Sequence, residues 1–203
     1  MNQMSIKSLF FYSKKPGSNL VHSGPSFAKA SDGQRSRPAA FSRRRFFGRI
    51  EIQNMFRIIK GDITKVKADV IVNAANTQLI HGGGVAKAIV IVAGEELEKE
   101  SRTSKLVPLG DFAVTTAGKL KAKKVIHIPT IDYKSGGGKI TYQQLSSVLE
   151  KALEYCNNQG FKKIATPLLG AGVVGLDGEK VKEIILEIAK KFPELEITLV
   201  EFK

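Results

Sequence analysis

The sequence predicts an α/β fold for residues 55–203, in which helices pack on a central sheet. Short apolar, β-branched runs alternate along the chain with helical patterns, and this order is typical of layered α/β domains. Glycine-rich loops follow two of the predicted strands, and ligands of α/β sheets bind at the carboxyl ends of strands. The 203 residues are enough for one such domain with an appendage.

The first half of this domain contains four predicted strands and one predicted helix. The strands are expected at residues 56–59, 69–74, 112–116 and 125–128, and the helix, interpreted as buried, from residue 84 to about residue 102. Pro129 has no backbone N–H group, so we expect it to end the fourth strand. Turn-forming residues predict loops at 60–64 and 135–139.

The second half contains two amphipathic helices and two further strands. Thr141 is predicted to cap the first helix, with Gln144 completing a capping box, and Asp177 to cap the second. The core-facing residues are Leu145, Val148, Leu149, Ala152, Leu153 and Cys156 in the first helix, and Val181, Ile184, Ile185, Ile188, Ala189 and Phe192 in the second. The strands are expected at residues 164–169 and 197–202.

The first glycine loop, Gly82 to Gly84, lies between a predicted strand and the start of a predicted helix. Three glycines let the backbone approach a ligand closely and adopt positive φ without steric cost. The free N–H groups of the first helical turn and the positive end of the helix dipole then favour an anion, most often phosphate. Asn73 and Asn76 in the preceding strand place carboxamides beside this predicted anion site.

The second glycine loop, residues 170–175, has the literal G-x-G-x-x-G spacing of a dinucleotide-binding turn. A Rossmann site is disfavoured because only 28 residues follow Gly175, and because Glu196 lies at the start of the next strand rather than at its end. A P-loop at Lys139 is excluded because Ile140 takes the place of the required Ser or Thr. The two glycine loops together suit a nucleotide that contains a diphosphate.

Charge and cysteine content narrow the class of protein. Of the net charge of +13, residues 1–54 carry +8 and residues 55–203 carry +5, so the predicted domain is mildly basic. Cys156 is the single cysteine, which excludes an internal disulfide and favours a reducing compartment, so we expect a cytoplasmic protein. No apolar run reaches the length of a membrane span. We expect a monomer without a metal site or cofactor.

Residues 1–54 are rich in Ser, Gly, Pro and Arg and show no sustained periodicity, so we predict a disordered basic extension. One interpretation is an arm that binds nucleic acid or a membrane surface. Another is a transit-type presequence, because the segment is poor in acids and rich in Arg and Ser. A third is that it has no function. Met55 directly precedes the first strand, so the extension is also explained by a mis-assigned translation start.

Six short motifs occur in an order that resembles the macro domain family, whose members bind ADP-ribose. They are Gly61-Asp62-Ile63-Thr64, Asn73-Ala74-Ala75-Asn76, His81-Gly82-Gly83-Gly84-Val85-Ala86, Pro108-Leu109-Gly110-Asp111, Val125-Ile126-His127 and Pro167-Leu168-Leu169-Gly170-Ala171-Gly172. Each motif is weak alone, but the ordered set is specific and covers residues 55–203. The resemblance implies a three-layer α/β/α sandwich with a mixed central sheet, and ADP-ribose or an ADP-ribosylated protein as partner.

The resemblance also implies roles for individual residues. Asp62 would accept a hydrogen bond from the adenine amino group beside the Ile63 backbone, and Phe202 would cover the adenine face. Asn76 would hold the distal ribose. The diphosphate would lie between Gly82, Gly83, Gly84 and Val85 on one side and Gly170, Ala171, Gly172, Val173 and Val174 on the other. The competing interpretation of Asp62 is an acid in a turn that accepts hydrogen bonds from local N–H groups. The competing interpretation of Phe202 is a terminal residue without contacts.

The leading hypothesis for activity is hydrolysis of ADP-ribosyl or O-acyl-ADP-ribose esters at the distal ribose, with Asn76 and His81 as catalytic residues. Asn76 would fix the sugar, and a diphosphate oxygen would position the attacking water. Most of the rate gain would then come from orientation. His81 would polarise the nearby hydroxyl groups, or would serve only the structure of the loop.

The chain departs from the family pattern, and its lack of the Asp and His of the hydrolytic members favours a competing hypothesis, a non-catalytic reader of ADP-ribosylated proteins or free ADP-ribose. Ala86 and Val90 stand where the best-known hydrolytic members carry Asp and His, and Val174 stands where many members carry an aromatic. The chain instead resembles the branch with His-Gly-Gly-Gly-Val-Ala, in some members of which hydrolysis persists without the Asp. A third hypothesis is nucleic-acid binding through the basic residues 1–54.

Overall fold

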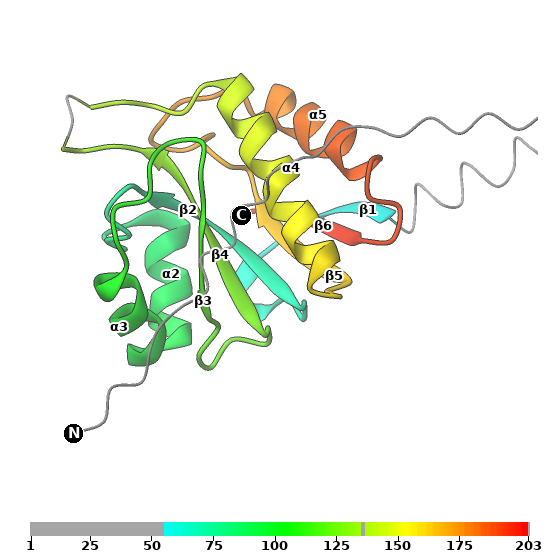
Figure 1. Ribbon diagram of the computed structural model, residues 1–203. Coiled ribbons are helices and arrows are strands. Elements are labelled where there is room, and N and C mark those ends of the chain that lie inside the picture. Colours follow the sequence, from blue (N-terminus) through cyan, green and yellow to red (C-terminus); the bar gives the residue numbers. More distant parts are fainter. Residues whose placement is uncertain (1–54, 135–136, 203) are drawn as a thin grey trace, which may run out of the picture. The chain divides into compact units, whose positions relative to one another are not determined.

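The computed structural model describes residues 55–134 and 137–202 (Figure 1). The predictions for residues 1–54 therefore lie outside the described residues. The strands are β1 (Phe56–Lys60), β2 (Val70–Asn76), β3 (Ala113–Thr116), β4 (Lys124–Ile131), β5 (Lys163–Pro167) and β6 (Glu196–Glu201). The helices are the short 3-10 turn η1 (Ile63–Lys65), α2 (Gly84–Ala93), α3 (Glu95–Thr103), α4 (Tyr142–Asn158) and α5 (Gly178–Ala189).

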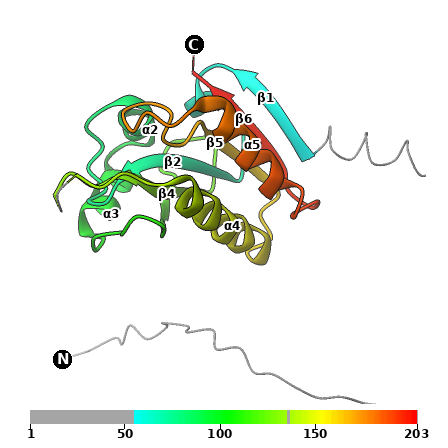
Figure 2. The same cartoon turned by 90° about the horizontal axis from the view of Figure 1, so that it is seen from above.

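The six strands form one mixed sheet in the order β1-β6-β5-β2-β4-β3. All neighbouring strands run parallel except β3, which pairs antiparallel with β4 at the edge. Figure 2 shows β1 at the other edge of the sheet, beside β6. Because β2, β4, β5 and β6 run parallel, their carboxyl ends all lie at one end of the sheet. This end is called the carboxyl edge, and the opposite end, where these strands begin, is called the amino edge.

Alternation along the central strands sends side chains into two separate cores. In β2, Val70 and Val72 belong to the core beneath α4 and α5, whereas Ile71 belongs to the core beneath α2 and α3. The same alternation places Ile164 of β5 in the first core and Ala165 in the second. Helices thus cover both faces of the sheet (Figure 1), which confirms the expected three-layer α/β/α sandwich.

The predicted caps of the two amphipathic helices are confirmed. The Thr141 hydroxyl accepts from the Gln144 N–H group, and the Gln144 side chain accepts from the Thr141 N–H group, which forms the capping box that begins α4. The Asp177 carboxylate accepts from the Lys180 N–H group at the start of α5. These caps satisfy N–H groups that lack partners within the helix and so fix where each helix begins.

The expected single buried helix over residues 84–102 is wrong in two respects. The chain breaks at Gly94, whose φ of 87° no helical residue adopts, and two helices result. Helix α2 is also only half buried, since Ile91 is 68% exposed while Ile89 is fully buried. The long apolar run concealed this amphipathic arrangement because apolar residues occupy the solvent face as well.

The expected end of β4 at Pro129 is also wrong, because the strand continues to Ile131. The partner strand β3 extends along β4 only as far as His127. Proline lacks an N–H group, and this disrupts a sheet least where one side of the strand has no neighbouring strand. The pairing of β2 with β4 becomes irregular directly after Ala75 and Pro129.

Candidate functional site

A cleft of about 910 Å³ lies at the carboxyl edge of the sheet, where the loops that follow β1, β2, β5 and β6 come together. This volume is within the usual range of small-molecule and cofactor sites. The predicted site residues that line the cleft are Ile63, Asn76, Gly82, Gly83, Gly84, Val85, Gly170, Ala171, Gly172, Val173, Val174 and Phe202. Segments that are far apart in the sequence therefore meet around one cavity.

The first glycine loop leaves its backbone open toward this cleft. A Cβ atom added at Gly82, Gly83 or Gly84 would have no neighbouring atom within 4 Å. Gly84 begins α2 with a φ of 55°, a conformation that favours glycine, whereas Gly83 has extended backbone. The first-turn N–H groups of α2 thus lie beside an open space, as anion binding requires.

The Asn76 side chain folds back on its own loop. Its Oδ1 atom accepts from the backbone N–H groups of Gln78 and Ile80, at 3.1 and 3.0 Å, and its Nδ2 atom donates to the Ile80 carbonyl at 2.6 Å. Between these contacts Leu79 has a φ of 53°, which is strained for a branched side chain. Asn76 therefore stabilises a strained turn, and one of its amide N–H groups remains for a ligand.

A lysine side chain holds the backbone of the second glycine loop. Lys139 donates from Nζ to the Val174 carbonyl at 3.1 Å, while the Val174 side chain is buried and that of Val173 is exposed. Gly170 has a φ of 77°, and a Cβ atom there would lie 2.8 Å from the Leu176 side chain. The positive φ and the nearby Leu176 side chain thus favour glycine at this position, independent of any ligand.

The other end of the cleft lies beside β1 and β6. Gly61, Ile63 and Phe202 line it, and Phe202 is 85% exposed. Asp62 is not among the lining residues, because its Oδ1 atom accepts from the N–H and hydroxyl groups of Thr64. These hydrogen bonds hold the pKa of Asp62 below its usual value. Asp62 borders the cleft as the acid of a turn, and its contact with adenine stays a prediction.

His81 points away from the cleft. Its Nε2 atom lies 3.0 Å from the Ser101 hydroxyl of α3, and its Nδ1 atom lies 3.5 Å from the Asn73 amide nitrogen. His81 is half buried and is not among the described residues that line the cavity. Burial lowers the pKa of its imidazole, against the opposing charge of Glu98. This geometry favours the structural interpretation of His81 over the catalytic one.

His127 is fully buried in β4, where its ring lies beside that of His81, the residue that precedes the first glycine loop. Its Nδ1 atom lies 3.0 Å from the Asn73 amide nitrogen and its Nε2 atom 2.8 Å from the Thr115 hydroxyl. Burial lowers the pKa of His127 to about 3, with a further contribution from the neighbouring His81 ring. The imidazole is therefore neutral at neutral pH and serves to join β2, β3 and β4.

Cys156 is buried in the face of α4 that packs on the sheet, and burial raises the pKa of its thiol to about 12. It therefore has no nucleophilic role. The described residues contain no cluster of three His, Cys, Asp or Glu side chains that could hold a metal ion. None of the described helices is both long and apolar enough to cross a membrane.

Sequence reasoning missed several lining residues, of which Gln78, Thr130, Tyr133 and Glu201 bear polar side chains. The Gln78 Nε2 atom is buried and has no hydrogen-bond partner among the described residues, so it can donate to a ligand. Tyr133 is 62% exposed at the mouth of the cleft. No motif marked either residue, because only the fold brings the loop that follows β4 beside the loop that follows β2.

Comparison with known proteins gives a consistent result. The chain matches the family described as Macro domain over residues 72–185. A protein of Aquifex aeolicus is 40% identical over 136 residues, which is 67% of this chain and 81% of that protein. A macro domain-containing protein of Methanosarcina mazei is 38% identical over 136 residues, covering 67% of this chain and 72% of its own length.

Solved structures with the same fold include two that contain nucleotide ligands. The Oceanobacillus iheyensis macrodomain with ADP is 28% identical, with a TM-score of 0.65 over 73% of this chain and 83% of that one. The Trypanosoma brucei macrodomain in complex with ADP-ribose is 27% identical, with a TM-score of 0.66 over 75% and 65%. The matched segment and the relatives show that this chain belongs to the macro domain family.

Proposed function

We propose that the cleft at the carboxyl edge of the sheet binds ADP-ribose. The observation that carries this proposal is that one continuous cavity is lined by both glycine loops. Similar macrodomains have been solved with ADP and with ADP-ribose, which supports the same ligand class for this chain. Backbone N–H groups and the α2 dipole would neutralise a diphosphate without a lysine or a metal ion.

The two ends of the cleft suggest how the ligand is oriented. Phe202 and Ile63 form an apolar end that suits the adenine ring. Asn76 and Gln78 supply amide N–H groups at the other end, which suits the hydroxyl groups of the distal ribose. Gly82 to Gly84 and the second glycine loop then flank the diphosphate between them.

We further propose that the protein hydrolyses an ADP-ribosyl or O-acyl-ADP-ribose ester at the distal ribose. Among the described lining residues, Tyr133 and Glu201 carry the titratable side chains. Glu201 forms an ion pair with Lys182 at 2.6 Å and precedes Phe202, at the apolar end. No lining carboxylate or imidazole of the described chain thus serves as a base near the ribose, and the rate gain would come from orienting the ester and the water.

The competing function is a reader that binds ADP-ribosylated protein without cleaving it. The departures at Ala86 and Val90 favour it, because Ala86 lines the cleft where an acid would act. The two functions make opposite predictions in one experiment. The protein is titrated with ADP-ribose by calorimetry, and the same sample is then tested for release of ADP-ribose from a protein modified on Glu side chains.

Binding together with release supports the hydrolase. Binding without release above background supports the reader. No heat of binding in the calorimeter, together with no protection of the protein against thermal unfolding by excess ADP-ribose, contradicts both functions, because each requires the cleft to be occupied.

A further inference from the structure

We propose that the amino edge of the sheet, opposite the cleft, binds the phosphodiester backbone of nucleic acid without sequence preference. Six exposed lysines gather there and are called the lysine edge: Lys67, Lys119, Lys121, Lys123, Lys162 and Lys163. Five of them belong to the three loops that lead into β2, β4 and β5, and Lys163 is the first residue of β5. This inference concerns a surface that the proposed ADP-ribose function does not use.

Backbone hydrogen bonds hold the three loops together. The Ala68 N–H group donates to the Lys121 carbonyl at 3.2 Å, and the Asp69 N–H group donates to the Lys163 carbonyl at 2.7 Å. Strands β5, β2 and β4 are consecutive in the sheet, so the loops form one continuous strip. With strands spaced about 4.8 Å apart, the strip extends about 10 Å across the sheet.

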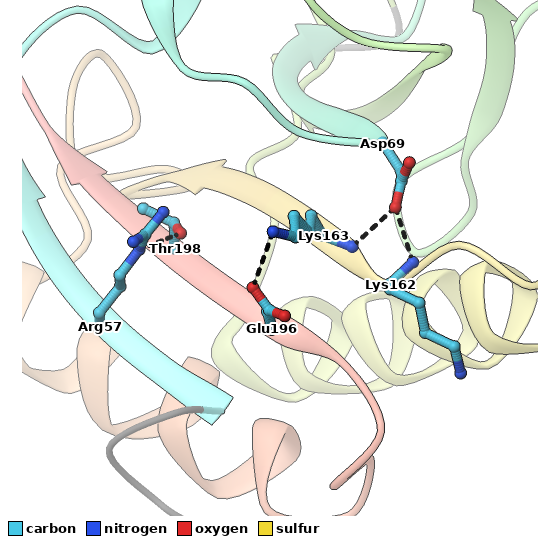
Figure 3. A network of polar contacts seen from close by, with 6 residues as sticks. All are labelled: Arg57, Asp69, Lys162, Lys163, Glu196 and Thr198. Atoms are coloured by element: carbon cyan, nitrogen blue, oxygen red, sulfur yellow. Dashed lines mark hydrogen bonds and ion pairs between the residues drawn. The ribbon is translucent and has the colours of Figure 1, made fainter.

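Two carboxylates neutralise only part of this strip. Asp69 pairs with the Lys123 ammonium at 2.8 Å and accepts from the backbone N–H groups of Lys162 and Lys163. Figure 3 shows that the Lys162 ammonium itself points away from Asp69. The second carboxylate, Glu196, pairs with Lys163 at 3.5 Å.

Four members of the lysine edge, Lys67, Lys119, Lys121 and Lys162, form no ion pair with any described residue. Glu95 and Glu96 begin α3 directly after Gly94, which lies beside the Lys119 side chain. The strip therefore keeps an excess of positive charge at its centre, around β2.

The chemistry of the strip favours nucleic acid over the other polyanionic partners. A peripheral membrane surface inserts apolar side chains among its basic residues. In the described chain the exposed large apolar residues all lie in other segments: Ile58, Ile80, Ile91, Val92, Leu106, Tyr133, Val173 and Phe202. A protein interface likewise needs an apolar or aromatic centre. Phe161, in the loop before β5, is partly buried, with the Lys123 ammonium 5.9 Å from its ring centroid, so the strip has no exposed aromatic centre. Flexible lysines without an exposed apolar centre suit a phosphate backbone, which is recognised through charge.

The test uses the full chain and a fluorescein-labelled single-stranded DNA of 20 nucleotides. One variant combines Lys67→Gln, Lys121→Gln and Lys162→Gln. A matched control combines Lys99→Gln, Lys105→Gln and Lys151→Gln, which are exposed lysines on α3, on the loop after it and on α4. Both proteins keep residues 1–54 and lose the same net charge, so any difference between them comes from the position of the charges.

We expect the lysine-edge variant to bind the oligonucleotide at least tenfold more weakly than the control variant at 100 mM salt. The oligonucleotide binding constant falls as the salt concentration rises, and the magnitude of this slope on a log–log plot should decrease by about 2. Each phosphate contact on a single strand contributes about 0.7 to it. ADP-ribose at saturating concentration should not displace the oligonucleotide, and the lysine-edge variant should keep the affinity of the unmutated protein for ADP-ribose.

Three results would overturn the inference. The first is an equal loss of affinity, or none, in the two variants, because net charge or residues 1–54 would then explain binding. The second is displacement of the oligonucleotide by ADP-ribose, which would place it in the cleft. The third is lysine-dependent binding to vesicles of anionic lipid without binding to the oligonucleotide. A failure of ADP-ribose to bind the unmutated protein would contradict the proposed function, but it would not affect the comparison of oligonucleotide binding between the two variants.

Discussion

The amide nitrogen of Asn73 lies 3.0 Å from Nδ1 of His127, and both side chains are fully buried at the centre of the sheet. An amide nitrogen only donates, so Nδ1 accepts and the proton of the neutral ring lies on Nε2, which donates to the Thr115 hydroxyl. The same amide nitrogen faces His81 at 3.5 Å. This chain of contacts joins three strands to the residue that precedes the first glycine loop.

The first prediction is that acidification destabilises the domain through His127. Burial holds its folded pKa at about 3, far below the value of about 6.5 in the unfolded chain. The unfolded state therefore binds a proton that the folded state does not, so stability is complete above pH 6.5 and falls as the pH falls toward 3. The expected slope is about 1.4 kcal/mol per pH unit below pH 6. Urea unfolding between pH 7.5 and 5 measures it.

The variant His127→Gln provides the control for this prediction. Glutamine does not titrate, so the slope between pH 7.5 and 5 should largely disappear even if the variant is less stable overall. Carboxylates titrate mostly below this window and contribute little to it. An unchanged slope in His127→Gln would mean that another group, His81 first of all, controls the acid sensitivity.

The second prediction concerns the first glycine loop. Gly82→Glu should abolish ADP-ribose binding and leave thermal stability nearly unchanged. A Cβ atom added there meets no atom within 4 Å and Gly82 does not have positive φ, so we expect the fold to tolerate the substitution, while the carboxylate would enter the proposed phosphate path. Calorimetry and thermal unfolding measure the two effects.

Gly170→Ala is the contrasting variant, because its Cβ atom would lie 2.8 Å from Leu176 and its φ of 77° is strained for alanine. It should lose stability as well as affinity. If Gly82→Glu binds ADP-ribose normally, the first glycine loop does not face the ligand.

The third prediction is that Lys139 holds the second glycine loop in its binding conformation. Lys139→Met removes the hydrogen bond from Nζ to the Val174 carbonyl. Because Lys139 is exposed, the loss should be modest, about three- to tenfold in ADP-ribose affinity. Lys139→Arg keeps a donor and should retain most of the affinity, so equal losses in the two variants would contradict a role for this hydrogen bond.

The sequence predicted the layered fold because alternation in the strands and the helix caps are local signals. It also predicted both glycine loops, since their motifs are contiguous. The direction of the His81 side chain was not predictable, because Ser101 becomes its neighbour only when α3 packs beside α2 and β3. The break at Gly94 was concealed for a similar reason, since the apolar residues of α2 continue onto its solvent face. Motifs identified the loops, and tertiary packing decided where their side chains point.

The last prediction separates the two roles of Asn76. Asn76→Ala removes three hydrogen bonds that hold residues 76–80, including the strained Leu79, so stability should fall by about 1–3 kcal/mol. The release of ADP-ribose from modified Glu side chains should fall on the order of 100-fold, since a displacement of about 1 Å at the reacting centre has that effect. ADP-ribose affinity should fall less, because the diphosphate and adenine contacts lie elsewhere.

Asn76→Asp distinguishes structure from chemistry at this position. The carboxylate still accepts from the Gln78 and Ile80 N–H groups but has no N–H group to offer the ribose or the Ile80 carbonyl. We expect only part of the stability to return, because a carboxylate oxygen would face the Ile80 carbonyl, while kcat stays low and KM changes little. Asn158→Ala, at the exposed end of α4, is the control and should match the unmutated protein in both measurements. A normal kcat in Asn76→Asp would show that Asn76 serves the turn alone.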